Sequence, residues 1–142
     1  MKTTLLLIFI GAFFVSGKSQ SFTTQDSLMA FKWELYTDAH FENDISVVLS
    51  YNSTIETETT VYDDGETEVN NSSYYLSYSI DLQFDTNKIG TSKNGRYLVI
   101  CRMDKKAVCY KIAALTNQKL ILIHVESPNA VTEWIAREKY GS

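Results

Sequence analysis

Apolar and polar residues alternate along much of this chain, and the alternation is most regular from Tyr74 to Asp85. The even positions of this stretch, from Tyr74 to Phe84, are all apolar or aromatic, whereas the odd positions after Tyr75 are all polar. Successive side chains of a strand point to opposite faces, so the pattern predicts one long strand with a dry face and a wet face. A helix would scatter the same apolar side chains around its circumference.

Shorter segments of the same kind predict seven further strands. Their ranges are 31–36, 45–51, 55–62, 66–69, 96–102, 107–115 and 119–126. Asp63-Asp64-Gly65 is expected to form a tight hairpin turn with glycine at positive φ, and residues 70–73 a second turn. A short helix or turn is expected at 21–30, with Thr24 or Asp26 as its cap.

The residues after the last predicted strand indicate a short helix. Ser127-Pro128 suits an N-cap followed by proline at the first helical position, and Val131, Trp134 and Ile135 then share one stripe. The strand at 119–126 is apolar on both faces, so its outer face needs a cover. We therefore expect this C-terminal helix to lie against the outside of that strand.

A sheet of eight strands joined by short connections has two unpaired edges unless it closes on itself. The sequence therefore predicts an all-β fold: an eight-stranded antiparallel up-and-down barrel with a short C-terminal helix packed outside. Such a barrel has room inside for packed side chains or for one small ligand. The side chains expected to face this interior are those of Trp33, Leu49, Tyr78, Ile80, Leu82, Phe84, Tyr110 and Leu122.

These interior residues allow two interpretations. They either fill a solid core or line a cavity that binds a small, mostly apolar molecule. Buried tyrosines need hydrogen-bond partners, which favours a partly wet or ligand-filled interior. Arg102 also allows two interpretations. It either points inward near a barrel end and meets a ligand carboxylate, or is solvated beside the neighbouring turn.

The N-terminus, residues 1–19, has the layout of a secretory signal peptide. A basic start precedes an apolar run at 5–15, and small residues follow. The run is too short to act as a stable membrane anchor. Cleavage is expected after Gly17 or Ser19, and the second site leaves a single domain at 20–142. The sequence therefore predicts a secreted or periplasmic protein.

Charge is distributed unevenly in this chain of net charge −4. Between Trp33 and Asn87 there are twelve carboxylates and no lysine or arginine, whereas from Lys88 to the end ten basic residues accompany four carboxylates. A negative chain of this kind is not expected to bind nucleic acid. The division either gives neighbouring strands solvated faces of opposite sign or forms a surface for a basic protein partner or a second copy of the chain.

The two cysteines, Cys101 and Cys109, lie on strands joined by a turn. If the loop consists of Asp104 to Lys106, the cysteines face each other across the hairpin, and an exported protein with an even number of cysteines is expected to form the disulfide. A two-residue loop would place the thiols on opposite faces instead. Two cysteines without further spaced ligands do not make a zinc site.

Candidate catalytic and metal-binding groups are few. His40 is interpreted as a surface residue and His124 as a hydrogen-bonded residue at the barrel rim, since neither has the partners of an acid–base or metal site. The acidic hairpin at 63–68 lacks the spacing of an EF-hand loop. No Ser-His-Asp order, phosphate loop or HExxH motif is present. The sequence therefore predicts a non-enzymatic protein with no metal or cofactor.

Three short motifs occur together in the second half of the chain. Gly95-Arg96-Tyr97 opens one strand, residues 110–116 follow the pattern Y-x-I-x-x-L-T, and Leu120-Ile121-Leu122 lies in the last strand. Together with Trp33, this arrangement resembles small secreted bacterial lipocalin-like domains over residues 28–126, with Phe31 where these domains usually carry glycine. The resemblance implies a calyx-shaped barrel that can bind an apolar ligand, with Trp33 at its base.

From these observations we expect an exported binding protein for a small, mostly apolar ligand. The alternative is an interaction or structural module of the cell envelope or extracellular space. Such a module would contact a protein partner through the charge-divided surface and would have no small-molecule ligand.

Overall fold

The computed structural model describes residues 22–36, 45–102 and 106–139, which form one closed barrel. Eight antiparallel strands pair in the order of the sequence, and the first also pairs with the last. The strands are β1 (Phe31–Leu35), β2 (Ser46–Tyr51), β3 (Ile55–Val61), β4 (Thr67–Ser77), β5 (Tyr97–Cys101), β6 (Ala107–Leu115), β7 (Lys119–His124) and β8 (Val131–Glu138). The predicted all-β class and closed up-and-down barrel are confirmed. The predicted signal peptide and His40 lie outside the described residues.

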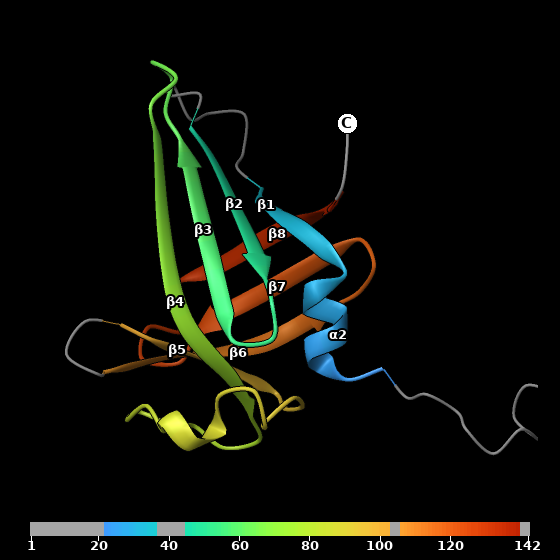
Figure 1. Ribbon diagram of the computed structural model, residues 1–142, viewed down its shortest axis with the longest axis vertical. Helices are drawn as coiled ribbons and strands as arrows, with labels where there is room; N and C mark the ends of the chain where they lie inside the picture. Colours follow the sequence, from blue (N-terminus) through green and yellow to red (C-terminus); the bar gives the residue numbers. More distant parts are fainter. Residues whose placement is uncertain (1–21, 37–44, 103–105, 140–142) are drawn as a thin grey trace, which may run out of the picture.

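The strands β2 to β4 run across the direction of β6 to β8, so the two groups enclose the interior between them (Figure 1). The short helix α2 (Thr24–Met29) packs against β1 and β2. The N-cap of this helix is Thr23 rather than the predicted Thr24 or Asp26. Asp26 instead completes a capping box with Thr23. The Asp26 amide donates to Thr23 Oγ1 and the Thr23 amide donates to Asp26 Oδ2, each over 3.0 Å. Within the part of the chain described, no helix has the length and apolar character needed to cross a membrane.

The hairpin between β3 and β4 is partly as predicted. Gly65 adopts a positive φ of 85°, and the Tyr62 amide donates to the Glu66 carbonyl over 2.9 Å, so the predicted tight turn is confirmed. The second turn, predicted at 70–73, is wrong. These residues continue β4, because β3 pairs with them without interruption up to the pair Ile55 and Ser73. Backbone pairing along the whole hairpin outweighs the local turn preference of the Asn and Ser residues.

The long strand predicted from Tyr74 to Asp85 is also wrong after Ser77, where β4 ends. Ser77 Oγ accepts a hydrogen bond from the Ser79 amide over 3.1 Å, and this side-chain bond replaces the next ladder bond. Gly95 approaches the same point so closely that a Cβ there would collide with the Ser77 carbonyl. The chain therefore leaves the barrel wall at Ser77, passes through the short 3₁₀ helix η1 (Thr86–Lys88), and returns as β5.

The C-terminal helix predicted outside the barrel is replaced by β8 (Val131–Glu138). This segment pairs with β7 on one side and with β1 on the other, and so satisfies two strand edges that a helix would leave open. Ser127 caps a turn instead, because its carbonyl accepts from the Ala130 amide over 2.7 Å. Eight strands result nevertheless, because the predicted fourth and fifth strands are largely merged in β4.

The inner core extends to α2, whose Leu28 is fully buried in it. Trp33 is fully buried, and its indole Nε1 donates to the Leu28 carbonyl over 2.9 Å, which ties β1 to the helix. Leu76, Leu98 and Leu120 are likewise without exposed surface and belong to the same apolar cluster. This part of the interior is a dry, filled core.

Candidate ligand-binding cavity

A cavity of about 190 Å³ lies inside the barrel wall. Its lining combines apolar side chains with charged and hydroxyl-bearing ones contributed by strands on all sides of the barrel. The lining residues are Leu49, Glu56, Glu58, Ile100, Arg102, Tyr110, Leu122, Thr132 and Trp134. Burying charged groups beside empty space costs free energy unless they are paired or solvated, so this lining marks the cavity as different from the filled core.

Glu56 is the most deeply buried charged group of the cavity, with 2% of its surface exposed. It faces inward because β3 pairs Glu56 with Tyr51 of β2, whose ring is part of the inner core. The Tyr51 hydroxyl donates to Glu56 Oε2 over 2.7 Å. Burial raises the pKa of Glu56 to about 6, against the opposing effects of this hydrogen bond and of the Arg102 charge.

Arg102 follows β5 and contributes the positive charge of the cavity. Its Nη1 donates to Ser72 Oγ of β4 over 3.2 Å. Among the described residues, no ion pair joins Arg102 to Glu56 or Glu58. Of the two orientations that the sequence left open for Arg102, the inward one is observed, with Ser72 as its hydrogen-bond partner.

A groove of about 590 Å³ adjoins the cavity between β4 and the end of β5. It exists because β4 pairs with β5 only from Tyr74 to Ser77, so that residues 67–73 have no partner strand on that edge in the described structure. Glu58 and Arg102 line both the groove and the cavity. These two side chains thus stand at the boundary between the interior and the outside.

The structure places the sequence-predicted interior residues in three locations. Leu49, Arg102, Tyr110 and Leu122 line the cavity, whereas Trp33 is buried in the dry core beside it. The prediction is wrong for the residues beyond the end of β4. Tyr78, Ile80 and Leu82 are 71%, 50% and 52% exposed, and Phe84 packs on the outside of the barrel.

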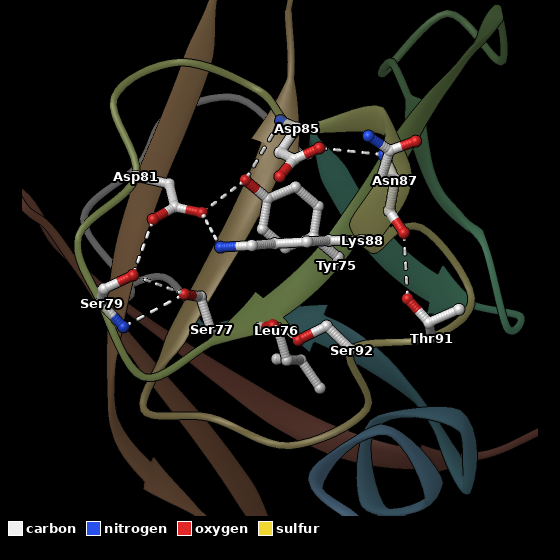
Figure 2. A network of polar contacts seen from close by, with 10 residues as sticks. All are labelled: Tyr75, Leu76, Ser77, Ser79, Asp81, Asp85, Asn87, Lys88, Thr91 and Ser92. Carbon is white, nitrogen blue, oxygen red and sulfur yellow. Dashed lines mark hydrogen bonds and ion pairs between the residues drawn. The ribbon is translucent and has the colours of Figure 1, made fainter.

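The segment after β4 is fastened over a second, outer cluster formed by Tyr75, Val99, Ala107 and Cys109. The Tyr75 hydroxyl donates to Asp81 Oδ2 over 2.7 Å, and Lys88 Nζ forms an ion pair with the same oxygen over 2.7 Å (Figure 2). The Phe84 ring lies 4.9 Å from the Tyr75 ring. Tyr75, which the alternation assigned to the wet face, is therefore fully buried outside the barrel.

The two cysteines do not face each other in the hairpin of β5 and β6. Cys101 pairs with Ala107 and Cys109 with Val99, a register that differs by two positions from the one expected. Both thiols are free, so the predicted disulfide is not formed. Cys109 is buried in the outer cluster, and burial raises the pKa of its thiol.

His124 has a structural partner rather than a catalytic one among the described residues. Its ring lies 5.3 Å from the ring of Tyr110 in an edge-to-face arrangement, and its Nδ1 accepts from the Glu126 amide over 3.1 Å. Both contacts fit the hydrogen-bonded rim residue that the sequence predicted.

The sequence interpretation missed several lining residues, above all Glu56 and Glu58. The odd positions of β3 include Ile55 and Val61, so the period-two pattern favours Glu56 and Glu58 on the wet face. A signal was present in the turn that follows β2. Tyr51 pairs with Glu56, so an inward Tyr51 fixes an inward Glu56 once the turn length is known. Trp134 and Thr132 were missed because β8 was assigned to a helix.

No protein-family model matches this chain, and no curated protein or solved structure matches it significantly. The eight-stranded antiparallel barrel is compatible with a lipocalin-like fold. Any function must therefore be inferred from the site itself.

Proposed function

We propose that this protein binds one small molecule inside its barrel and catalyses no reaction. The observation that carries the proposal is the cavity of about 190 Å³ inside the barrel, whose lining combines apolar, charged and hydroxyl-bearing side chains. Protein interiors contain few spaces larger than a water molecule, so a space of this size has room for a ligand or for several waters.

The volume sets the size of the ligand. A cavity of about 150 Å³ is enough for benzene, and the share of one water in the liquid is about 30 Å³. The cavity of about 190 Å³ thus suits a single ring with a short substituent, or about six waters in its place.

The lining sets the chemistry of the ligand. Leu49, Ile100 and Leu122 offer apolar contact, while Glu56 and Arg102 offer charge and hydrogen bonds. The expected ligand therefore has an apolar body and one polar group, which refines the mostly apolar molecule that the sequence predicted.

Tryptophan fluorescence combined with native mass spectrometry tests the proposal. Trp134 lines the cavity, whereas Trp33 is buried in the dry core. A ligand extracted from the purified protein and added back should change the emission of the Trp33→Phe variant, which keeps Trp134. The Trp134→Phe variant should respond much less. Protein that carries no small molecule and shows no response to a library of ring-sized compounds would refute the proposal.

A matched pair of substitutions locates the ligand. Leu122→Phe adds a ring to the cavity, whereas Ile123→Phe adds the same ring on the other face of β7. Leu122→Phe should abolish binding and Ile123→Phe should preserve it. Equal binding by both variants would place the ligand elsewhere.

The unpaired edge of β4 supports a second candidate, a protein-interaction module. Residues 67–73 have backbone groups without a partner strand in the described structure, and such edges accept an added strand from another chain. Asn71→Lys should weaken such an interaction in cross-linking experiments, because an edge lysine opposes strand addition. A monomer that cross-links to no partner would count against this candidate.

A further inference from the structure

We infer that the cavity selects a small organic cation, a protonated amine on an apolar body about the size of one ring. The inference rests on the proposed function and adds the charge of the ligand to it. Its basis is the composition of the lining, in which two carboxylates, Glu56 and Glu58, accompany one guanidinium, Arg102.

The Glu56 carboxylate can accept further hydrogen bonds from a ligand. It is 2% exposed, it lines the cavity, and its one side-chain hydrogen bond in the described structure comes from Tyr51. An ionised carboxylate offers about four acceptor positions, so most of its capacity is left for an occupant of the cavity. An ammonium group carries three donors in a compact volume and suits an acceptor of this kind.

Arg102 does not reverse this preference. Its Nη1 is engaged by Ser72 Oγ, and the side chain lies where the cavity meets the outer groove rather than at the centre of the interior. With both carboxylates ionised, the three charged groups sum to one negative charge. A ligand cation neutralises that charge, whereas a ligand anion increases it in a region of low dielectric.

Two aromatic lining residues add to the attraction for a cation. Tyr110 and Trp134 both border the cavity, and the negative faces of aromatic rings attract ammonium groups. The Trp134 indole is fixed, because its Nε1 donates to Thr132 Oγ1 over 2.9 Å. The ligand would thus meet carboxylates and aromatic rings in one small space.

The same arrangement makes binding sensitive to pH. The titratable and charged groups around Glu56 are Tyr51 of β2, Glu58 of β3, Tyr74 of β4 and Arg102 after β5. Burial raises the pKa of Glu56 to about 6, so this carboxylate loses its charge as the pH falls through that value. The affinity for a cation should fall over the same range, while the affinity for a neutral compound should change little.

The test compares three probes of nearly equal size and different charge: benzylamine, benzyl alcohol and benzoate. Calorimetric titration of the full-length protein at neutral pH should give the tightest binding for benzylamine, by at least tenfold over benzoate. Glu56→Gln should reduce that preference at least tenfold, and Glu58→Gln should do so to a smaller extent. Glu66→Gln, an exposed position on the hairpin, removes the same charge and should leave the preference unchanged.

The outcomes distinguish the inference from the proposed function. Binding of benzoate or benzyl alcohol as tight as that of benzylamine overturns the inference and leaves the proposed function standing. Binding of none of the three probes overturns the inference, and it overturns the proposed function as well if the library of ring-sized compounds also gives no response. If Glu56→Gln does not fold, the preference is read from Glu58→Gln and from the pH profile of the wild-type chain. A pH-independent preference between pH 5 and 8 then overturns the inference.

Discussion

Two tyrosine–carboxylate pairs lie on opposite sides of the barrel wall and share the same geometry. Inside, the Tyr51 hydroxyl donates to Glu56 over 2.7 Å; outside, the Tyr75 hydroxyl donates to Asp81 over 2.7 Å. Burial raises the pKa of Glu56 to about 6, but the pKa of Asp81 lies below its ordinary value. The same type of hydrogen bond is therefore found at one carboxyl group with a raised pKa and at one with a lowered pKa.

The difference comes from the other partners of each carboxylate. Burial by itself would raise the pKa of Asp81, but hydrogen bonds from Lys88, Tyr75 and Ser79 together lower it. Glu56 has no ammonium or guanidinium in direct contact within the described structure. The outer pair is thus a satisfied contact that fastens a loop, whereas the inner pair leaves acceptor capacity for a ligand. A buried carboxylate that uses only part of its hydrogen-bonding capacity therefore indicates a candidate binding site.

The largest predicted effect concerns the outer pair. Tyr75→Ala removes a fully buried ring and its hydrogen bond to Asp81, and should lower the free energy of unfolding by about 3–5 kcal/mol. Tyr78→Ala is the matched control, because Tyr78 is 71% exposed, and should change it by less than about 0.5 kcal/mol. Urea denaturation measures both values. Similar losses for the two variants would mean that residue 78 still belongs to the barrel wall.

Removing the two carboxylate charges should change stability in opposite directions. Glu56→Gln removes a charge that burial disfavours, and should raise the free energy of unfolding at pH 7 by up to about 2 kcal/mol, since one pKa unit corresponds to about 1.4 kcal/mol. Asp81→Asn weakens the contacts with Lys88 and Tyr75, and should lower it by about 1–2 kcal/mol. Denaturation at pH 7 is again the measurement. A shift of the same sign for both variants would contradict the comparison.

The pH dependence of stability should separate the pairs as well. The folded-state pKa of Glu56 is raised from 4.5 to about 6, so its contribution is fully present below pH 4.5 and is lost as the pH rises through about 6. The pKa of Asp81 is lowered from 3.8, so its contribution is present above pH 3.8 and is lost as the pH falls further. The measurement is the denaturation midpoint across pH 3–7. In Glu56→Gln the midpoint should depend less on pH between 4.5 and about 6. In Asp81→Asn it should depend less on pH below 3.8.

The smallest predicted effect uses a thiol as a reporter of the outer loop. Cys109 is 2% exposed beneath this loop, whereas Cys101 is partly accessible. A thiol reagent should therefore modify Cys101 first. Asp81→Asn should raise the reaction rate of Cys109 several-fold by loosening the loop, and Glu56→Gln should leave it unchanged. An unchanged rate in Asp81→Asn would show that the ion pair does not hold the loop closed.

The alternation of apolar and polar residues was enough to predict the class and closure of the fold. Trp33 and Leu49 lie on short strands whose inward faces the sequence identified correctly, and Gly65 marked its hairpin. Inward Leu49, Tyr110 and Leu122 were predicted for the same reason, since period-two patterning fixes the face of a strand once its range is known.

The positions that the sequence could not decide are those where a distant segment competes with local preference. β4 ends at Ser77, where Gly95 packs against the Ser77 backbone, although the alternation continues to Asp85. Val131 to Glu138 is compatible with an amphipathic helix by pattern, and becomes a strand because β1 and β7 each offer it an open edge.

The sequence alone determined that this chain forms a closed antiparallel barrel with aromatic and aliphatic side chains inside, because side-chain alternation is a local property of a strand. Only the tertiary structure decided that Glu56 and Arg102 share the interior and that Tyr78, Ile80 and Leu82 do not. The register of β2 with β3 decides that Glu56 points inward, and the end of β4 at Ser77 decides that Tyr78, Ile80 and Leu82 lie outside. Both depend on turns and on distant segments that no single strand encodes.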